Sequence, residues 1–243
     1  MNKVIVKKVL SILMALLIIT TLSMEKPIAV GAQTPTSLTV TSVKGVKGGN
    51  ANISVNISAN SGVAAGTFVL KYDSAKFEVT SADKGSAISM GTSDVYVDSK
   101  NGKVTLAYIN IDGFKDSGEI LDVKFKAKNA TYGVYPITLS VTEFFDKNYK
   151  AISNRVVNGK ITVIPATPKV SVLRGNSTAV KGSATKGSVV YAKIGSKTYY
   201  ATASFKSGAF SIKIPKIKKG VSVLVSCKAG GQFSASKMVK ALV

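Results

Sequence analysis

The chain has 243 residues, with 33 lysines and arginines against 12 aspartates and glutamates, which gives a net charge of +21. It contains no histidine, no tryptophan and a single cysteine, Cys227. Without histidine the chain cannot use Ser-His-Asp or Cys-His catalysis, and nearly all zinc sites are excluded. One cysteine cannot form an intrachain disulfide. We therefore predict a protein that is not an enzyme and has no metal or cofactor of its own.

The first 32 residues have the pattern of a secretory signal peptide. Three lysines near the N-terminus precede an apolar run over residues 9–22, which is short for a membrane span. Small residues at 30–32 form a cleavage site, so the mature chain is expected to begin at Gln33. An uncleaved N-terminal anchor is the alternative. Because a secreted protein without disulfides fits a Gram-positive bacterium, we expect an extracellular or cell-wall-associated location.

A short proline-containing stretch, IPATP at residues 164–168, marks the predicted boundary between two domains. Two prolines three residues apart stiffen the chain and interrupt strand pairing. Residues 36–165 carry 15 basic and 11 acidic side chains, whereas residues 166–243 carry 14 basic side chains and no acidic one. We predict a first domain over residues 33–164, a linker over 165–168 and a basic second domain over 169–243.

The first domain reads as all-β, because short stretches of alternating apolar and polar residues are separated by turn residues. The expected strands are residues 37–43, 51–58, 67–72, 76–81, 95–98, 103–109, 120–127, 133–141 and 159–164. Asn101-Gly102 predicts a type I′ hairpin turn, and Asn158-Gly159 predicts a second turn before the last strand. Nine short strands on about 130 residues favour a two-sheet sandwich.

The second domain also reads as all-β, with turns expected at Lys186-Gly187, Gly195-Ser196, Ser207-Gly208 and Gly230-Gly231. The expected strands are residues 169–174, 179–184, 189–194, 197–204, 209–214, 221–229 and 236–241. Cys227 shares a strand face with three valines, which indicates a buried and unreactive thiol.

Several segments of the first domain resemble cohesin domains, the modules of bacterial cellulosome scaffolds that hold dockerin-bearing enzymes. The matching segments are FVLKYD (68–73), VTLAYINIDG (104–113), EILDVKFKAK (119–128), YPITLS (135–140) and VVNGKITV (156–163). The resemblance implies a nine-stranded jelly-roll sandwich, which is close in fold to some carbohydrate-binding modules. The string from residue 180 to 215 resembles bacterial Ig-like domains, which implies a smaller β-sandwich and says little about function.

The cohesin resemblance implies that a flat sheet surface made by the middle strands binds the partner. Family positions that often carry hydrogen-bonding side chains align here with Ala65, Thr67 and Ile111, which depart from that pattern. The candidate partner-binding residues that we expect to point outward are Thr67, Tyr96, Asp98, Tyr108 and Asn110. Tyrosines beside short polar residues suit a protein partner or a sugar ring, and two ordinary half-exposed tyrosines remain the alternative.

Three pairs of acidic residues are candidate catalytic groups: Asp94 with Asp98, Asp112 with Asp116, and Glu143 with Asp146. A glycosidase needs two carboxylates on either side of one bond. These pairs lie at strand ends and in turns, where solvated carboxylates are usual. Carboxylates suit a hard cation such as calcium, so Asp98, Asp112 and Asp116 are candidate ligands, although no EF-hand spacing is present.

The lysine cluster Lys216, Lys218 and Lys219, in the segment IPKIKKG, is the candidate site for contact with the cell envelope. A domain with fourteen cations and no anion favours an anionic partner, such as wall teichoic acid or another acidic polymer. A solvated turn is the alternative. Nucleic acid is not expected, since the secretion pattern argues against it and the mature chain has only two arginines, Arg155 and Arg174.

Taken with the resemblance, these features predict a secreted, non-catalytic adaptor. Its first domain is expected to bind a dockerin-like module of an extracellular polysaccharide-degrading enzyme, and its basic domain to contact the envelope. Any calcium that binding needs would belong to the dockerin. Direct carbohydrate binding by the first domain, as in a lectin-like surface protein, is the alternative, and a structural spacer is a third possibility.

Overall fold

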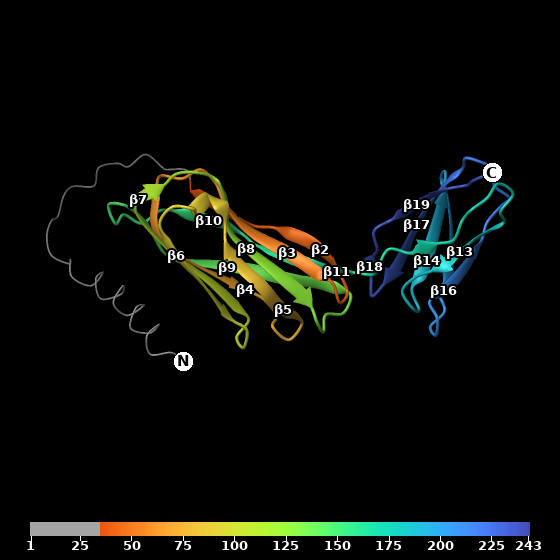
Figure 1. Cartoon of the computed structure of the whole chain (residues 1–243), viewed down its shortest axis with the longest axis horizontal. Coiled ribbons are helices and arrows are strands. Elements are labelled where there is room, and N and C mark those ends of the chain that lie inside the picture. The colour runs from red at the N-terminus through yellow and green to blue at the C-terminus, as the bar shows by residue number, and fades with distance from the viewer. Residues whose placement is uncertain (1–34) are drawn as a thin grey trace. The chain divides into compact units, whose positions relative to one another are not determined.

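The computed structural model describes residues 35–243, which form strands, turns and one short 3₁₀ helix, η1 (Ser86–Ile88) (Figure 1). The predicted signal peptide at residues 1–32 lies outside the described residues. Between residues 35 and 243 the structure has no helix with the length and apolar character needed to cross a membrane. The predicted all-β fold class is confirmed.

The N-terminal sandwich consists of two sheets. One has the strand order β10-β1-β3-β8-β5, and the other has the order β2-β11-β9-β4-β7-β6. The strands are β1 (Thr36–Val40), β2 (Ser42–Val46), β3 (Asn50–Ile57), β4 (Val63–Lys71), β5 (Phe77–Lys84), β6 (Thr92–Asp98), β7 (Lys103–Phe114), β8 (Gly118–Ala127), β9 (Gly133–Asp146), β10 (Asn154–Val157) and β11 (Gly159–Ile164). Between the sheets lies one apolar core, whose largest side chains include Phe68, Phe77 and Phe125.

The first and last segments of this sandwich pass together from one sheet to the other. β1 pairs in parallel with β10 in the first sheet, and β2 pairs in parallel with β11 in the second. Only Thr41 separates β1 from β2, and only Asn158 separates β10 from β11. A side-chain Cβ at Gly159 would lie 2.2 Å from the carbonyl oxygen of Thr41, so this close approach requires glycine.

Two sequence predictions are corrected by this arrangement. Residues 37–43 were expected to form one strand, but the chain changes sheets at Thr41 and forms two. Asn158-Gly159 was expected to form a turn, but it is the point where β10 passes into β11, and the Asn158 Oδ1 accepts a hydrogen bond from the Leu139 backbone N–H at 2.9 Å. The N-terminal sandwich therefore has eleven strands instead of the nine expected.

The predicted hairpin between β6 and β7 is confirmed, but its turn type is not type I′. The strands pair from Asp98 opposite Lys103 onward, so four residues form the loop. Gly102 has a φ of 64°, whereas Asn101 is not among the residues with positive φ, and a type I′ turn needs both. A Cβ at Gly102 would lie 2.2 Å from the Tyr72 carbonyl oxygen.

The C-terminal sandwich has a three-stranded sheet with the order β12-β13-β16. Its second sheet has the order β15-β14-β17-β18, with β19 also paired to β17. The strands are β12 (Lys169–Val170), β13 (Ala179–Ser183), β14 (Val189–Ile194), β15 (Lys197–Thr202), β16 (Ala209–Lys213), β17 (Ser222–Ala229), β18 (Gln232–Phe233) and β19 (Lys237–Lys240). Its core is separate from that of the first sandwich and contains the Cys227 side chain, which is fully buried, as predicted.

Candidate functional site: the outer face of a four-strand surface

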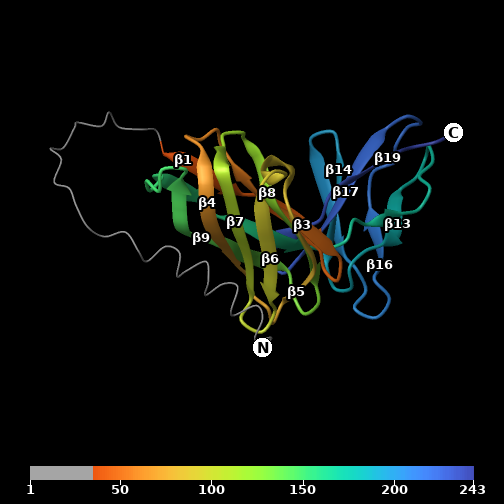
Figure 2. The ribbon, with the colours of Figure 1, turned by 60° about the vertical axis from the view of Figure 1, so that its left-hand side comes forward.

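The strands β9, β4, β7 and β6 lie side by side in one sheet of the N-terminal sandwich (Figure 2). Alternate residues of β4 and β7 enter the core, so the residues between them face outward. We call the surface that they form the outer face. Its members are Ala65, Thr67 and Val69 of β4, Thr105, Ala107 and Ile109 of β7, and Asp94 and Tyr96 of β6. Ile111 extends it along β7.

The strand register arranges these residues in rows across the sheet. Tyr96 lies opposite Thr105, which lies opposite Val69, and the next row places Asp94, Ala107 and Thr67 together. Most of these side chains are small or β-branched, so the centre of the face is level, and Asp94 on β6 is the one charged member of this set. A level, weakly polar sheet surface is suited to contact with another protein over a broad area.

Three large side chains stand on the outer face. Tyr96 is 59% exposed, Ile109 is 49% exposed and Ile111 is 86% exposed. An isoleucine with most of its surface in water gains nothing from folding, whereas its burial against a partner is favourable by about 1.5–3 kcal/mol. These residues are therefore the main apolar contacts that the outer face offers.

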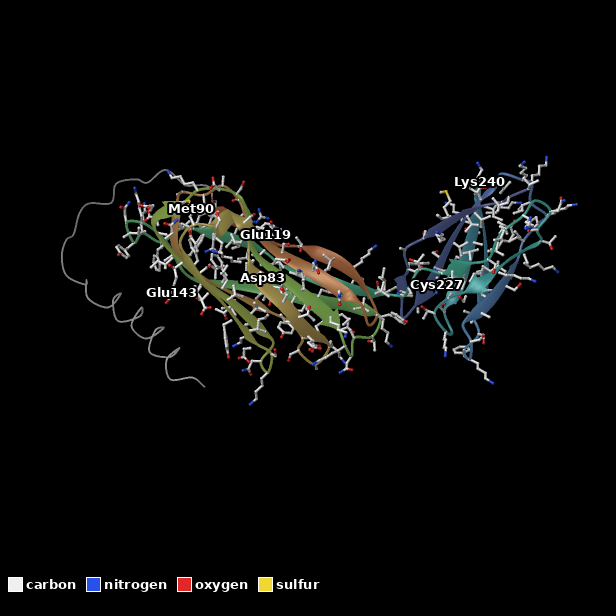
Figure 3. The ribbon with its side chains drawn as sticks, viewed as in Figure 1. Asp83, Met90, Glu119, Glu143, Cys227 and Lys240 are labelled. Carbon is white, nitrogen blue, oxygen red and sulfur yellow. The ribbon has the colours of Figure 1, made fainter. Side chains whose placement is uncertain are left out.

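A carboxylate at the edge of the outer face comes from β9. The pairing of β4 with β9 shifts between Ala65 and Thr67, so Glu143 and Phe144 form a bulge there. Glu143 has a φ of 54°, which is uncommon for a residue with a side chain. Figure 3 labels its side chain on the N-terminal sandwich. The Thr67 hydroxyl donates a hydrogen bond of 3.0 Å to the Glu143 carboxylate. Thr67 and Glu143 thus form an exposed polar pair beside the apolar centre.

Asp98, a predicted binding residue, has a structural role in the β6–β7 loop. Its carboxylate accepts hydrogen bonds from the backbone N–H and the side-chain Nδ2 of Asn101, at 3.1 and 2.7 Å. The side-chain hydrogen bond from Asn101 is the main cause that lowers the pKa of Asp98 below its ordinary value. Asp98 already has these donors, so it is less available to a partner than Tyr96.

The expectation that Tyr108 points outward is wrong. Tyr108 is only 4% exposed and belongs to the core, where its ring packs edge-to-face on Phe114 with centroids 5.3 Å apart. Its hydroxyl donates a hydrogen bond of 3.0 Å to the Met90 carbonyl oxygen. Asn110, two residues further on the strand, is half-buried, and its Oδ1 accepts a hydrogen bond from the Asp112 backbone N–H. Neither side chain belongs to the outer face.

The other acidic residues of the candidate pairs lie in strands of the N-terminal sandwich or in the loop between β7 and β8. In the part of the chain that the structure describes, Asp98, Asp112 and Asp116 are not brought together as a group of three that could hold a metal ion. Asp146 accepts hydrogen bonds from the backbone N–H groups of Asn148 and Lys150 and shapes its own turn.

The lysine cluster of the C-terminal sandwich lies in the loop between β16 and β17. Lys216, Lys218 and Lys219 are all exposed, whereas Ile217 between them is buried. Both backbone groups of Ile217 are hydrogen-bonded to the segment 176–177, at 2.8 and 3.2 Å. The fold therefore fixes the backbone of this loop and leaves its ammonium groups in solvent.

Comparison with known proteins identifies the class of the N-terminal sandwich. A family model described as "Cohesin domain" matches residues 36–163. The chain therefore belongs to the cohesin family, whose domains are non-catalytic scaffold modules. No curated protein sequence matches the chain.

Solved cohesin structures resemble the chain at low sequence identity. A non-cellulosomal cohesin from Archaeoglobus fulgidus is 19% identical over 54% of this chain and 92% of its own, with a TM-score of 0.49. The sixth cohesin of Acetivibrio cellulolyticus scaffoldin B, solved with a dockerin, is 23% identical over 54% and 99%, with a TM-score of 0.49. The cohesin CaCohA2 from Clostridium acetobutylicum is 24% identical over 53% and 90%, with a TM-score of 0.48.

Proposed function

We propose that this protein is a secreted adaptor whose N-terminal sandwich binds a dockerin-like module of an extracellular polysaccharide-degrading enzyme. The observation that carries the proposal is the cohesin family match over residues 36–163, which covers the strands that form the outer face. The chain then acts by recognition and by raising the local concentration of the enzyme, with no chemistry of its own.

The composition of the outer face sets the character of this interaction. Its centre has Ala107, Thr105 and Val69, and its large exposed side chains are Tyr96, Ile109 and Ile111. Affinity is therefore expected to come from apolar burial around these anchors, with Thr67 and Glu143 supplying hydrogen bonds at the edge. Paired calcium loops, where the partner needs them, belong to the dockerin-like module.

Secretion and envelope contact are the second part of the proposal. The signal-like pattern at residues 1–32 supports export, and the lysines at 216, 218 and 219 support contact with an anionic surface polymer. In this proposal the captured enzyme is held at the cell surface of a Gram-positive type bacterium.

Direct carbohydrate binding by the N-terminal sandwich has weaker support. That alternative relied on Tyr96 and Tyr108 as exposed stacking groups, and Tyr108 is buried. Tyr96 remains as one exposed ring among aliphatic side chains.

A binding experiment tests the dockerin proposal. The mature chain is immobilised and exposed to the secreted proteins of its source organism, with and without EDTA. Calcium-dependent capture of an enzyme that carries paired EF-hand-like loops supports the proposal. A purified captured module is then titrated against Ala107→Arg, which places a long charged side chain at the centre of the outer face, and against Thr39→Arg.

Thr39 is exposed on β1 of the opposite sheet and serves as the matched control. Ala107→Arg should weaken binding at least about tenfold, whereas Thr39→Arg should leave it unchanged. Equal affinities of the two variants would mean that the outer face is not the binding surface.

A further inference from the structure

A row of three aromatic side chains lies on the outward face of the larger sheet of the C-terminal sandwich. Tyr200 of β15 is 71% exposed, Phe233 of β18 is 50% exposed, and Tyr191 of β14 is half-buried between them. Tyr191 lies directly opposite Tyr200 in the strand register. Three exposed or half-exposed rings on one face of a sheet are costly to leave in water, so the row points to a partner.

The three rings are in contact along the row. The centroids of Tyr200 and Tyr191 are 6.2 Å apart, and those of Tyr191 and Phe233 are 5.5 Å apart, with interplanar angles of 42° and 50°. Each ring is therefore tilted relative to its neighbour, and together the rings form a shallow aromatic surface that runs across the strands. The spacing is similar to that of successive sugar rings in an extended polysaccharide, whose apolar C–H faces pack on aromatic rings.

Positive charge is built into the same surface. The Lys228 ammonium group lies 5.1 Å from the centroid of the Phe233 ring, in a cation–π arrangement. Lys193 of β14 is exposed and faces the same side as Tyr191, since the two are separated by one residue. Ser226 of β17 lies opposite Tyr191 and adds a hydroxyl group to the row.

No negative charge balances these lysines within the domain. Residues 166–243 contain fourteen basic side chains and no acidic one. A partner that contacts the aromatic row therefore meets uncompensated positive charge, and an anionic partner is favoured electrostatically.

We propose that this aromatic row, made by Tyr200, Tyr191 and Phe233 with Lys193 and Lys228 beside it, binds an acidic polysaccharide. The rings pack against the sugar units, and the lysines pair with the carboxylate or phosphate groups that the sugars carry. Both halves of the surface are needed, because aromatic rings alone suit neutral sugars and lysines alone suit any polyanion.

A nucleic acid is a weaker match to the same surface. Arginine stacks on bases and grips phosphate in a bidentate manner, but Arg174 is the only arginine of the domain and it lies outside the row, between β12 and β13. The neighbouring hydroxyl groups of Ser226 and the tyrosines suit sugar hydroxyls.

This inference rests on the proposed contact between the basic domain and the envelope, but it assigns that contact to a different surface. The lysine loop at 216–219 has no aromatic side chain, so it would recognise charge alone. The two surfaces are distinguished by variants that remove the rings and variants that remove the loop lysines.

The experiment measures binding of the mature full-length chain to five probes at fixed ionic strength. Polygalacturonate is the acidic polysaccharide, its fully methyl-esterified form has the same backbone without charge, and polyphosphate has charge without sugar rings. Single-stranded DNA and poly-glutamate are added to represent nucleic acids and acidic proteins. The test variants are Tyr200→Thr and Tyr191→Thr, in which a β-branched residue keeps the strand propensity.

Phe205→Ala is the matched control, because Phe205 is 80% exposed in the same sandwich and lies in the loop after β15. We expect the wild-type chain to prefer polygalacturonate over its esterified form. Each tyrosine substitution should weaken polygalacturonate binding about tenfold, the scale of one lost stacking contact, and should leave polyphosphate binding unchanged. Phe205→Ala should behave as the wild type, and thermal unfolding should confirm that all variants are folded.

Several results would overturn the inference. These are wild-type affinity of both tyrosine variants for polygalacturonate, binding of none of the polysaccharides, or tighter binding to DNA or poly-glutamate than to polygalacturonate. A further outcome is that binding falls only when Lys216, Lys218 and Lys219 are replaced by glutamine. That result would assign envelope contact to the lysine loop and would refute polysaccharide binding by the aromatic row. Capture of a dockerin-like module is measured separately and does not depend on any of these outcomes.

Discussion

Alanine substitution at Tyr108 should lower the stability of the fold, whereas alanine substitution at Tyr96 should lower partner binding. The reason is that the two side chains lie on opposite sides of the same sheet. Tyr108 is 4% exposed, packs edge-to-face on Phe114 and donates a hydrogen bond to the Met90 carbonyl oxygen. Removing a buried aromatic side chain costs about 3–5 kcal/mol, and its net hydrogen bond contributes about 1 kcal/mol. Tyr108→Ala should therefore lower the free energy of unfolding by about 4 kcal/mol, a large share of the ~5–15 kcal/mol typical of a domain.

Tyr96→Ala should cost no more than about 0.5 kcal/mol of stability, since the ring is 59% exposed. It should instead weaken the binding of a dockerin-like module, because Tyr96 is one of the three large side chains on the outer face. Tyr108→Phe isolates the hydroxyl group and should cost about 1 kcal/mol.

Urea denaturation of the full chain, followed by circular dichroism, measures the stability of each variant, and titration calorimetry measures binding at a temperature where all are folded. The reasoning is refuted if Tyr108→Ala is as stable as the wild type, or if Tyr96→Ala unfolds at much lower urea concentration.

Three further predictions concern stability. Gly159→Ala should destabilise the N-terminal sandwich by roughly 2 kcal/mol or more, seen as a lower urea midpoint, because its Cβ would collide with the Thr41 carbonyl oxygen. Tyr72→Phe should leave the midpoint unchanged or raise it, since the buried Tyr72 hydroxyl has no hydrogen-bond partner within residues 35–243. Burial raises the pKa of Tyr108, an effect that the Asn110 side chain partly offsets. The unfolded chain then releases the proton first, so stability is full below about pH 10 and falls as pH rises above it. Urea midpoints between pH 9 and 11 should therefore fall less steeply for Tyr108→Phe than for the wild type.

The sequence predicted both sandwiches and most of their strands, because alternation of apolar and polar residues is a local property. It could not settle which side of β7 faces the core. In the segment from Leu106 to Ile111, both alternate sets contain apolar residues, so the pattern allows either face to be buried. The structure buries Leu106 and Tyr108 and exposes Ile109 and Ile111. The large Tyr108 fits there because the backbone of Met90 offers an acceptor to its hydroxyl, a contact between residues 18 positions apart.

The sequence also could not predict that the chain passes from one sheet to the other between β1 and β2. The apolar positions change phase at Thr41, from Leu38 and Val40 to Val43, but this local change does not show that the chain moves to the other sheet. The change is fixed by the parallel partner strands β10 and β11, which lie more than one hundred residues later. Glu143 was missed on the outer face for a similar reason. Its position depends on a bulge in β9 that only the pairing with β4 defines.

The two proposed binding surfaces depend on different forces, although each is the outward side of a β-sheet. The outer face of the N-terminal sandwich has an uncharged centre with exposed isoleucines, so its binding energy comes from apolar burial, which salt does not weaken. The aromatic row of the C-terminal sandwich lies in a domain without a single acidic residue, so part of its binding energy is electrostatic and is screened by salt. If both proposals hold, we expect the chain to release an acidic polymer when ionic strength rises and still to hold its protein partner. That difference follows from where the sequence places its charges, since residues 36–165 carry nearly balanced charge and residues 166–243 carry only one sign.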